Sequence, residues 1–147
     1  MKGNGIINER LHLLADELAY LKSERDAVNN FYVYQENVRL KKAIERSLQV
    51  AIEICFDISQ RIISENGLRF AKTYSETFLV LQEEGIVSQR LGENLQNMAS
   101  FRNLIVHDYV KIDDEQVYAN LKKHLGDFDA FAAAIVQYLT NDLTPHD

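Results

Sequence analysis

Proline, glycine and cysteine are scarce in this chain of 147 residues. Proline occurs once, at Pro145, and there are six glycines, so little in the sequence interrupts long helices. Cys55 is the one cysteine, which excludes an intramolecular disulfide framework and, within an apolar stretch, predicts a buried, inert thiol. No apolar run approaches membrane-spanning length, and the N-terminus has no signal-peptide core. We therefore expect a cytoplasmic protein without a membrane segment.

The residues that are present are those of an ordinary helical globule. The composition, with 46% hydrophobic and 26% charged residues, is typical of a soluble globular protein. The length fits a single domain over residues 1–147. Apolar residues at helical spacing predict an all-α, up-and-down antiparallel bundle of about five helices. We expect these helices over residues 5–25, 34–63 and 74–84, then after an N-cap at Ser88, and finally from Asp113 onward.

The central helix is apolar on more than one side. Between Leu48 and Ile58 its apolar residues spread well beyond a single stripe. Such a helix has to be covered from several directions, and a partner subunit could supply one cover. We expect one residue in this stretch, Asp57, to be the buried partner of an arginine.

Residues 102–109 read Arg-Asn-Leu-Ile-Val-His-Asp-Tyr, so a guanidinium, an imidazole and a phenol follow an apolar helical pattern. An arginine is shaped to hold a phosphate, and a histidine gains or loses a proton near neutral pH. No set of residues at metal-ligand spacing and no glycine-rich phosphate loop accompanies them. The segment therefore suggests phosphodiester chemistry at Arg102 and His107 that needs neither a metal ion nor a cofactor.

The spacing of Arg102 and His107 leaves their geometry open. Five residues place them about 140° apart on a continuous helix, so they cannot share a face. Either the helix breaks near His107, or the two side chains meet groups from different subunits. The same pattern also has a structural interpretation, in which the arginine pairs with acids and the histidine closes the last turn.

The net charge of −6 does not favour a nucleic-acid partner, because phosphate contacts normally come from a basic surface. A local basic cleft can still form where lysines and arginines of two subunits converge. Four cations of the central helix form either such a basic rim or a solvated face paired with Glu36 and Glu45: Arg39, Lys41, Lys42 and Arg46.

Three segments resemble the HepT branch of the HEPN superfamily, and the likeness spans roughly residues 5–140. They are residues 39–53, 73–78 and 101–109. The motif of that branch is Arg, four residues, His, any residue, Tyr, and Arg102, His107 and Tyr109 occupy it without departure. Asn103 supplies the polar residue that usually follows the arginine. Each short motif is weak alone, but all three occur in order around matching helices.

The resemblance implies a ribonuclease toxin of a toxin-antitoxin pair that acts as a homodimer without metal. In that case His107 takes a proton from a ribose 2′-hydroxyl, and Arg102 neutralises charge on the phosphoryl oxygens, with Asn103 beside it. The resemblance also implies a partner, a minimal nucleotidyltransferase (MNT) antitoxin that adds AMP units to Tyr109. The added charge and bulk would repel RNA and occupy Arg102.

A second class of function stays open. The bundle could be a noncatalytic helical module that docks beside a nucleotidyltransferase and presents nucleotide or substrate to it. The negative net charge favours this module, whereas the intact Arg-His-Tyr set favours the ribonuclease.

Overall fold

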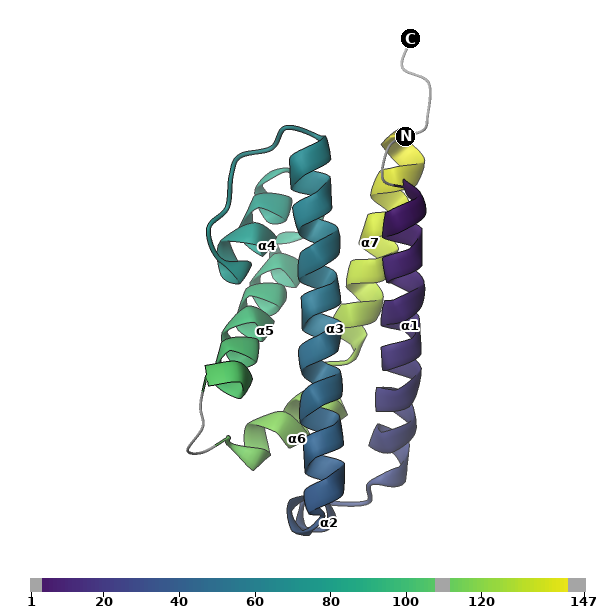
Figure 1. Cartoon of the computed structure of the whole chain (residues 1–147), viewed down its shortest axis with the longest axis vertical. Coiled ribbons are helices and arrows are strands. Elements are labelled where there is room, and N and C mark those ends of the chain that lie inside the picture. The colour runs from purple at the N-terminus through teal and green to yellow at the C-terminus, as the bar shows by residue number, and fades with distance from the viewer. Residues whose placement is uncertain (1–3, 108–111, 143–147) are drawn as a thin grey trace.

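The computed structural model describes residues 4–107 and 112–142, and within these ranges every regular element is an α-helix. The predicted all-α bundle is confirmed, with long helices that run up and down side by side (Figure 1). The described ranges contain seven helices, two more than expected. They are α1 (Asn4–Ala27), α2 (Phe31–Glu36), α3 (Val38–Glu65), α4 (Tyr74–Glu83), α5 (Gln89–His107), α6 (Asp114–Lys123) and α7 (Gly126–Asp142).

The first additional helix arises because the central helix, predicted from residue 34, is interrupted at Asn37. The backbone N–H of Asn37 donates to the Tyr34 carbonyl at 3.1 Å and ends α2. Its side-chain oxygen accepts the Leu40 N–H at 3.0 Å and begins α3. Asparagine side chains bond readily to nearby backbone, so one residue serves as the cap of two helices.

The second additional helix comes from the predicted last helix, which is broken after α6. Residues His124 and Leu125 separate α6 from α7, which begins at Gly126. Leu121, Leu125 and Phe128 keep spacings of four and three through the break, and all three are buried. Periodicity alone therefore does not reveal it.

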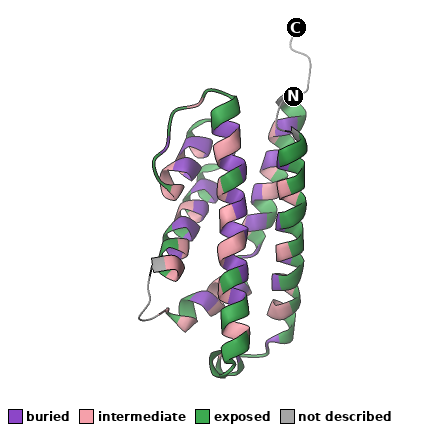
Figure 2. Ribbon diagram, in the orientation of Figure 1, coloured by how far each residue is buried: buried purple, intermediate pink, exposed green. Residues whose placement is uncertain are grey.

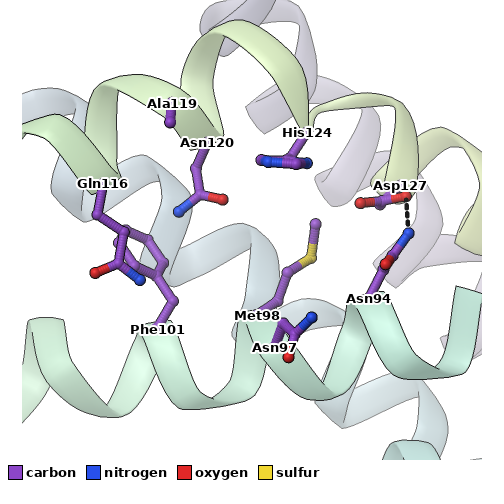
Figure 3. Close-up of a pocket in the computed structure, with 9 residues that line it drawn as sticks. All are labelled: Asn94, Asn97, Met98, Phe101, Gln116, Ala119, Asn120, His124 and Asp127. Carbon is purple, nitrogen blue, oxygen red and sulfur yellow. Dashed lines mark hydrogen bonds between the residues drawn. The ribbon is translucent and has the colours of Figure 1, made fainter.

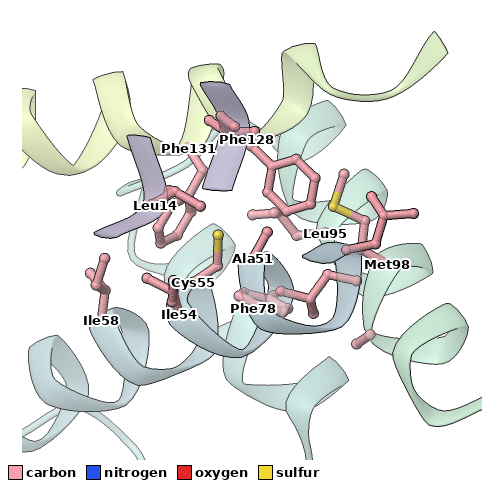
Figure 4. Close-up of a cluster of buried hydrophobic side chains, with 14 of the residues drawn as sticks. Leu14, Ala51, Ile54, Cys55, Ile58, Phe78, Leu95, Met98, Phe128 and Phe131 are labelled. Atoms are coloured by element: carbon pink, nitrogen blue, oxygen red, sulfur yellow. The ribbon is translucent and has the colours of Figure 1, made fainter. Parts of the chain in front are cut away.

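The core forms around α3, which packs against α1 on one side and against α4 and α5 on the other (Figures 1 and 2). Helices of the same chain thus account for the wide apolar girth of α3. Phe78 of α4 and Phe131 of α7 meet edge to face in this core, with ring centroids 6.5 Å apart (Figure 4). Burying each of these rings stabilises the fold by about 1.5–3 kcal/mol.

Two predictions about single residues of α3 have different outcomes. Cys55 is buried in the core, as expected, and this burial raises the pKa of its thiol, which keeps it protonated. The prediction for Asp57 is wrong in its burial, because the side chain is 61% exposed. Its carboxylate does lie 3.7 Å from Nε of Arg10, but in solvent. The apolar neighbours Ile54 and Ile58 point into the core, whereas position 57 lies on the outer face.

Candidate functional site

Arg102 lies near the C-terminal end of α5 and reaches across to α3. Its Nε and Nη2 atoms donate to one carboxylate oxygen of Glu53, at 3.1 and 2.7 Å. The two side chains are only 16% and 29% exposed, so the ion pair is largely shielded from water. Gln49, one turn earlier on α3, donates to the same oxygen at 3.2 Å. Two hydrogen bonds from one edge of a planar guanidinium fix its orientation as well as its position.

An aromatic pair supports the same guanidinium from its face. The Tyr74 ring, at the start of α4, lies with its centroid 4.4 Å from Cζ of Arg102. Phe56 of α3 stacks on Tyr74, with ring centroids 3.7 Å apart and an interplanar angle of 5°. A cation over an aromatic ring contributes about 0.5–2 kcal/mol, more as water is excluded. Partial burial raises the pKa of Tyr74, and the charge of Arg102 opposes this rise.

The remaining edge of Arg102 stays available for a ligand. A guanidinium has five N–H donors, and Glu53 accepts two of them. Nη1 donates to Oδ1 of Asn103 at a long 3.4 Å. Asn103 itself is exposed. Arg102 and Asn103, predicted together from sequence, therefore lie together at a surface where a phosphate oxygen could replace or join the asparagine.

The structure describes the other two motif residues incompletely. His107 is the last residue of α5, and only its backbone is described, while Tyr109 lies outside the described residues. The helix does not break between Arg102 and His107, so the two positions keep their separation of about 140° around the axis. The structural interpretation of the motif holds in part, because Arg102 does pair with an acid. That acid belongs to α3, 49 residues earlier in the chain.

Sequence reasoning missed the residues that hold Arg102. Glu53 is a carboxylate inside an otherwise apolar run, and such a group needs a partner when it is removed from water. From the sequence we apply the same argument to Asp57, one turn away, and expect the arginine partner there. The position of Tyr74 against this guanidinium has no signature in the local sequence.

The four cations expected to form either a basic rim or a solvated face differ in their contacts. Lys41 is not available, because its Nζ atom lies 3.0 Å from Oδ2 of Asp114. The other three cations are exposed, and within the described part of the chain they form no ion pair, with the predicted glutamates or with any other acid: Arg39, Lys42 and Arg46. No three His, Cys, Asp or Glu side chains of the described ranges gather as they would around a metal ion.

A polar hollow of about 230 Å³ lies on a different face of α5, between this helix and α6 (Figure 3). Phe101 contributes to its lining, whereas the next residue, Arg102, turns toward α3. Asn97, Asn120 and His124 border the hollow, and a 3.2 Å hydrogen bond from Asn94 to Asp127 closes one end. The hollow is therefore separate from the surface at which Arg102 presents its free edge.

The fold and this site define a class of protein: an all-α bundle with a clamped arginine near the end of its fifth helix, followed five residues later by a histidine. The chain belongs to the family described as Ribonuclease HepT-like, whose sequence profile matches residues 14–135. Among the described residues, no helix is both long and apolar enough to cross a membrane.

Individual relatives agree with this assignment. The chain is 29% identical to the tRNA nuclease HepT of Aphanizomenon flos-aquae over 136 residues, and this alignment covers 91% of the chain and 90% of the relative. It is 28% identical over 102 residues to the mRNA nuclease HepT of Shewanella oneidensis, which covers 69% and 77%. Its fold is similar to a solved structure of a tri-AMPylated Shewanella oneidensis HEPN toxin in complex with MNT antitoxin. That match has a TM-score of 0.82 and 24% identity, and covers 91% of this chain and 98% of that one.

Proposed function

We propose that this protein is a metal-independent ribonuclease that serves as the toxin of a toxin-antitoxin pair. The observation that carries the proposal is the Arg102 guanidinium, held by Glu53 and Tyr74 with one edge still available, five residues before His107. A guanidinium fixed in this way suits the charged oxygens of a phosphodiester. The relatives named mRNA nuclease and tRNA nuclease support RNA as the substrate.

In the proposed reaction a neutral His107 removes the proton from a ribose 2′-hydroxyl, and the freed oxygen attacks the adjacent phosphorus. The bond from phosphorus to the 5′-oxygen breaks, and that oxygen leaves with a proton from an acid. Arg102 stabilises the charge that develops on the nonbridging oxygens, with Asn103 beside its Nη1 atom. The products are a 2′,3′-cyclic phosphate and a 5′-hydroxyl.

The proposed active form is a homodimer. Arg102 and His107 occupy positions about 140° apart on one unbroken helix, so we expect the groups that act on one phosphate to come from two subunits. Two copies of His107 across a shared cleft would supply both the base and the acid. Mixing the two inactive variants Arg102→Ala and His107→Ala should then restore part of the activity, whereas residues that act within one subunit would give no restoration.

The test of the activity is digestion of RNA by the purified protein in EDTA, with the product ends identified. We expect cleavage to persist and to leave the cyclic phosphate and the 5′-hydroxyl. His107→Ala should slow cleavage on the order of 10²-fold or more while the protein remains folded. Activity that EDTA abolishes and magnesium restores would refute the metal-independent reaction.

The proposed regulation acts on Tyr109, two residues after His107. A partner minimal nucleotidyltransferase would transfer AMP to its hydroxyl, and the solved complex of an AMPylated HEPN toxin with an MNT antitoxin supports this partner. Co-expression should add mass in steps of AMP to the peptide that contains Tyr109, in the cytoplasm where we expect both proteins. Tyr109→Phe should block the addition. AMP found on another peptide of this variant would show that the modified residue is misassigned.

The noncatalytic docking module remains the second candidate, and the net charge of −6 favours it. The same variants separate the two functions. If Arg102→Ala and His107→Ala both fold and are as toxic as the wild type on induction, the ribonuclease proposal fails and the docking module gains support.

A further inference from the structure

Three exposed cations of α3 lie on the helix face that leads to Arg102. Arg39, Lys42 and Arg46 follow one another at spacings of three and four, and Glu53 continues the same series. At 100° per residue all four positions fall within an arc of about 60°. Because Glu53 holds Arg102, the arginine of α5 stands at the end of a row of cations that belongs to α3.

The three cations are exposed, so a ligand can reach them. None forms an ion pair with a described residue. Glu45 lies on the flank of α3 toward Lys41. Burial, and then the charge of Asp114, raise the pKa of Glu45, and the charges of Lys41 and Lys42 partly offset this rise. In Figure 2 the lower end of α3 is coloured mostly exposed on the side that faces the viewer.

The unpaired cations of this face lie on one side of the site, and the acids at and beyond it are paired with arginines. Arg39 to Arg46 span about 10 Å of helix, and Glu53 lies about 10 Å further on. Beyond it the same face carries the exposed Asp57, beside Arg10. Since α5 runs antiparallel to α3 (Figure 1), the residues after Arg102 run toward the end of α3 that carries the cations. An anionic chain is therefore attracted along the half of α3 that carries the unpaired cations.

We infer that Arg39, Lys42 and Arg46 form a track for the phosphate backbone of single-stranded RNA, which guides the strand to Arg102. This inference rests on the proposed function, and it names the surface by which a protein of charge −6 attracts its substrate. The track contacts phosphates at a distance from the cleavage point, so it contributes to binding of the substrate and of the transition state alike. Removing its charges raises KM and leaves kcat nearly unchanged.

The test compares two double variants that each lose one lysine and one arginine. Lys42→Gln/Arg46→Gln removes track charges. Arg90→Gln/Lys123→Gln is the control, since Arg90 begins α5 at the end far from Arg102, and Lys123 adjoins Lys122, which bonds to carbonyls at the end of α1. Both control cations are exposed.

Affinity for a short fluorescein-labelled single-stranded RNA is measured across a salt series, in the His107→Ala background to prevent cleavage. Each phosphate neutralised on a single strand contributes about 0.7 to the slope of log affinity against log salt, so the track variant should lose about 1.4. Its KM for cleavage should rise on the order of tenfold with kcat within about twofold. The control variant should keep the salt slope and the KM of the wild type.

The outcomes separate this inference from the proposed function. If the wild type cleaves RNA but the two double variants bind it equally well, the track is refuted and the ribonuclease stands. If the wild type binds RNA without cleaving it, and only the track variant shows a smaller slope of log affinity against log salt, the track stands and the proposed ribonuclease activity is refuted. If the track variant instead loses affinity for the nucleotidyltransferase while RNA binding is unchanged, the face binds a protein and the inference is overturned.

Discussion

The ion pair of Arg102 with Glu53 is expected to stabilise the fold more than a surface pair does. A double-mutant cycle measures this coupling directly, with Arg102→Met, Glu53→Gln and the combination. Methionine keeps much of the apolar stem that packs near Tyr74, and glutamine keeps the shape of Glu53, so the cycle removes charge with little change in volume. Unfolding in urea, followed by far-ultraviolet circular dichroism, gives the four free energies.

The magnitude follows from the burial and geometry of the pair. Exposed ion pairs contribute about 0–1 kcal/mol, and hydrogen bonds to charged groups about 1.5–3 kcal/mol. Arg102 and Glu53 lie between these cases, because two N–H groups meet one oxygen and the side chains are 16% and 29% exposed. We therefore expect a coupling of about 1–2 kcal/mol.

A surface pair of similar length provides the control. Nζ of Lys22 lies 2.9 Å from Oδ2 of Asp129, but these side chains are 38% and 50% exposed. The cycle of Lys22→Met with Asp129→Asn should give less than about 1 kcal/mol. A coupling at Arg102 and Glu53 no larger than that of the control would refute the reasoning that Glu53 holds the guanidinium in place.

Three further predictions concern the core. Gly92→Ala should destabilise the protein by about 1 kcal/mol or more in urea, because a Cβ there would lie 2.8 Å from Cβ of Gln82, and the strain exceeds the gain in helix propensity; unchanged or higher stability would contradict this. Cys55 should react with a thiol reagent only in denaturant, since burial keeps it covered and raises its pKa; rapid reaction of the native protein would contradict it. Tyr34→Phe should stabilise the fold by about 1 kcal/mol at neutral pH, because the buried hydroxyl has no hydrogen-bond partner among the described residues. Burial raises the pKa of the Tyr34 hydroxyl above 10.0, so above that pH this hydroxyl ionises only in the unfolded chain. With rising pH the melting temperature of the wild type should therefore fall faster than that of Tyr34→Phe; parallel curves would contradict this.

The helices and the motif could be read from local sequence, because both depend on neighbours along the chain. Apolar spacings of three and four place α1, α3 and α5 nearly where they occur, since the period of the helix and of its buried stripe are the same. Arg102 and Asn103 are adjacent, so their joint position at the end of α5 needed no tertiary information. The predictions for His107 and Tyr109 as functional groups stay predictions.

The interruptions at Asn37 and after α6 are not visible in the apolar period, because that period continues through both. A capping side chain and a change of direction leave the identity of the buried residues unaltered, so the pattern cannot distinguish one helix from two.

Tertiary structure alone decided which acid meets Arg102. Glu53 and Asp57 both lie in the apolar stretch of α3 and are equivalent by sequence, yet one side chain faces α5 and the other faces solvent. That choice depends on which arginine of a neighbouring helix stands level with each carboxylate, Arg102 of α5 beside Glu53 and Arg10 of α1 beside Asp57. The residues that orient the arginine are therefore a property of how the helices pack, and no local pattern encodes them.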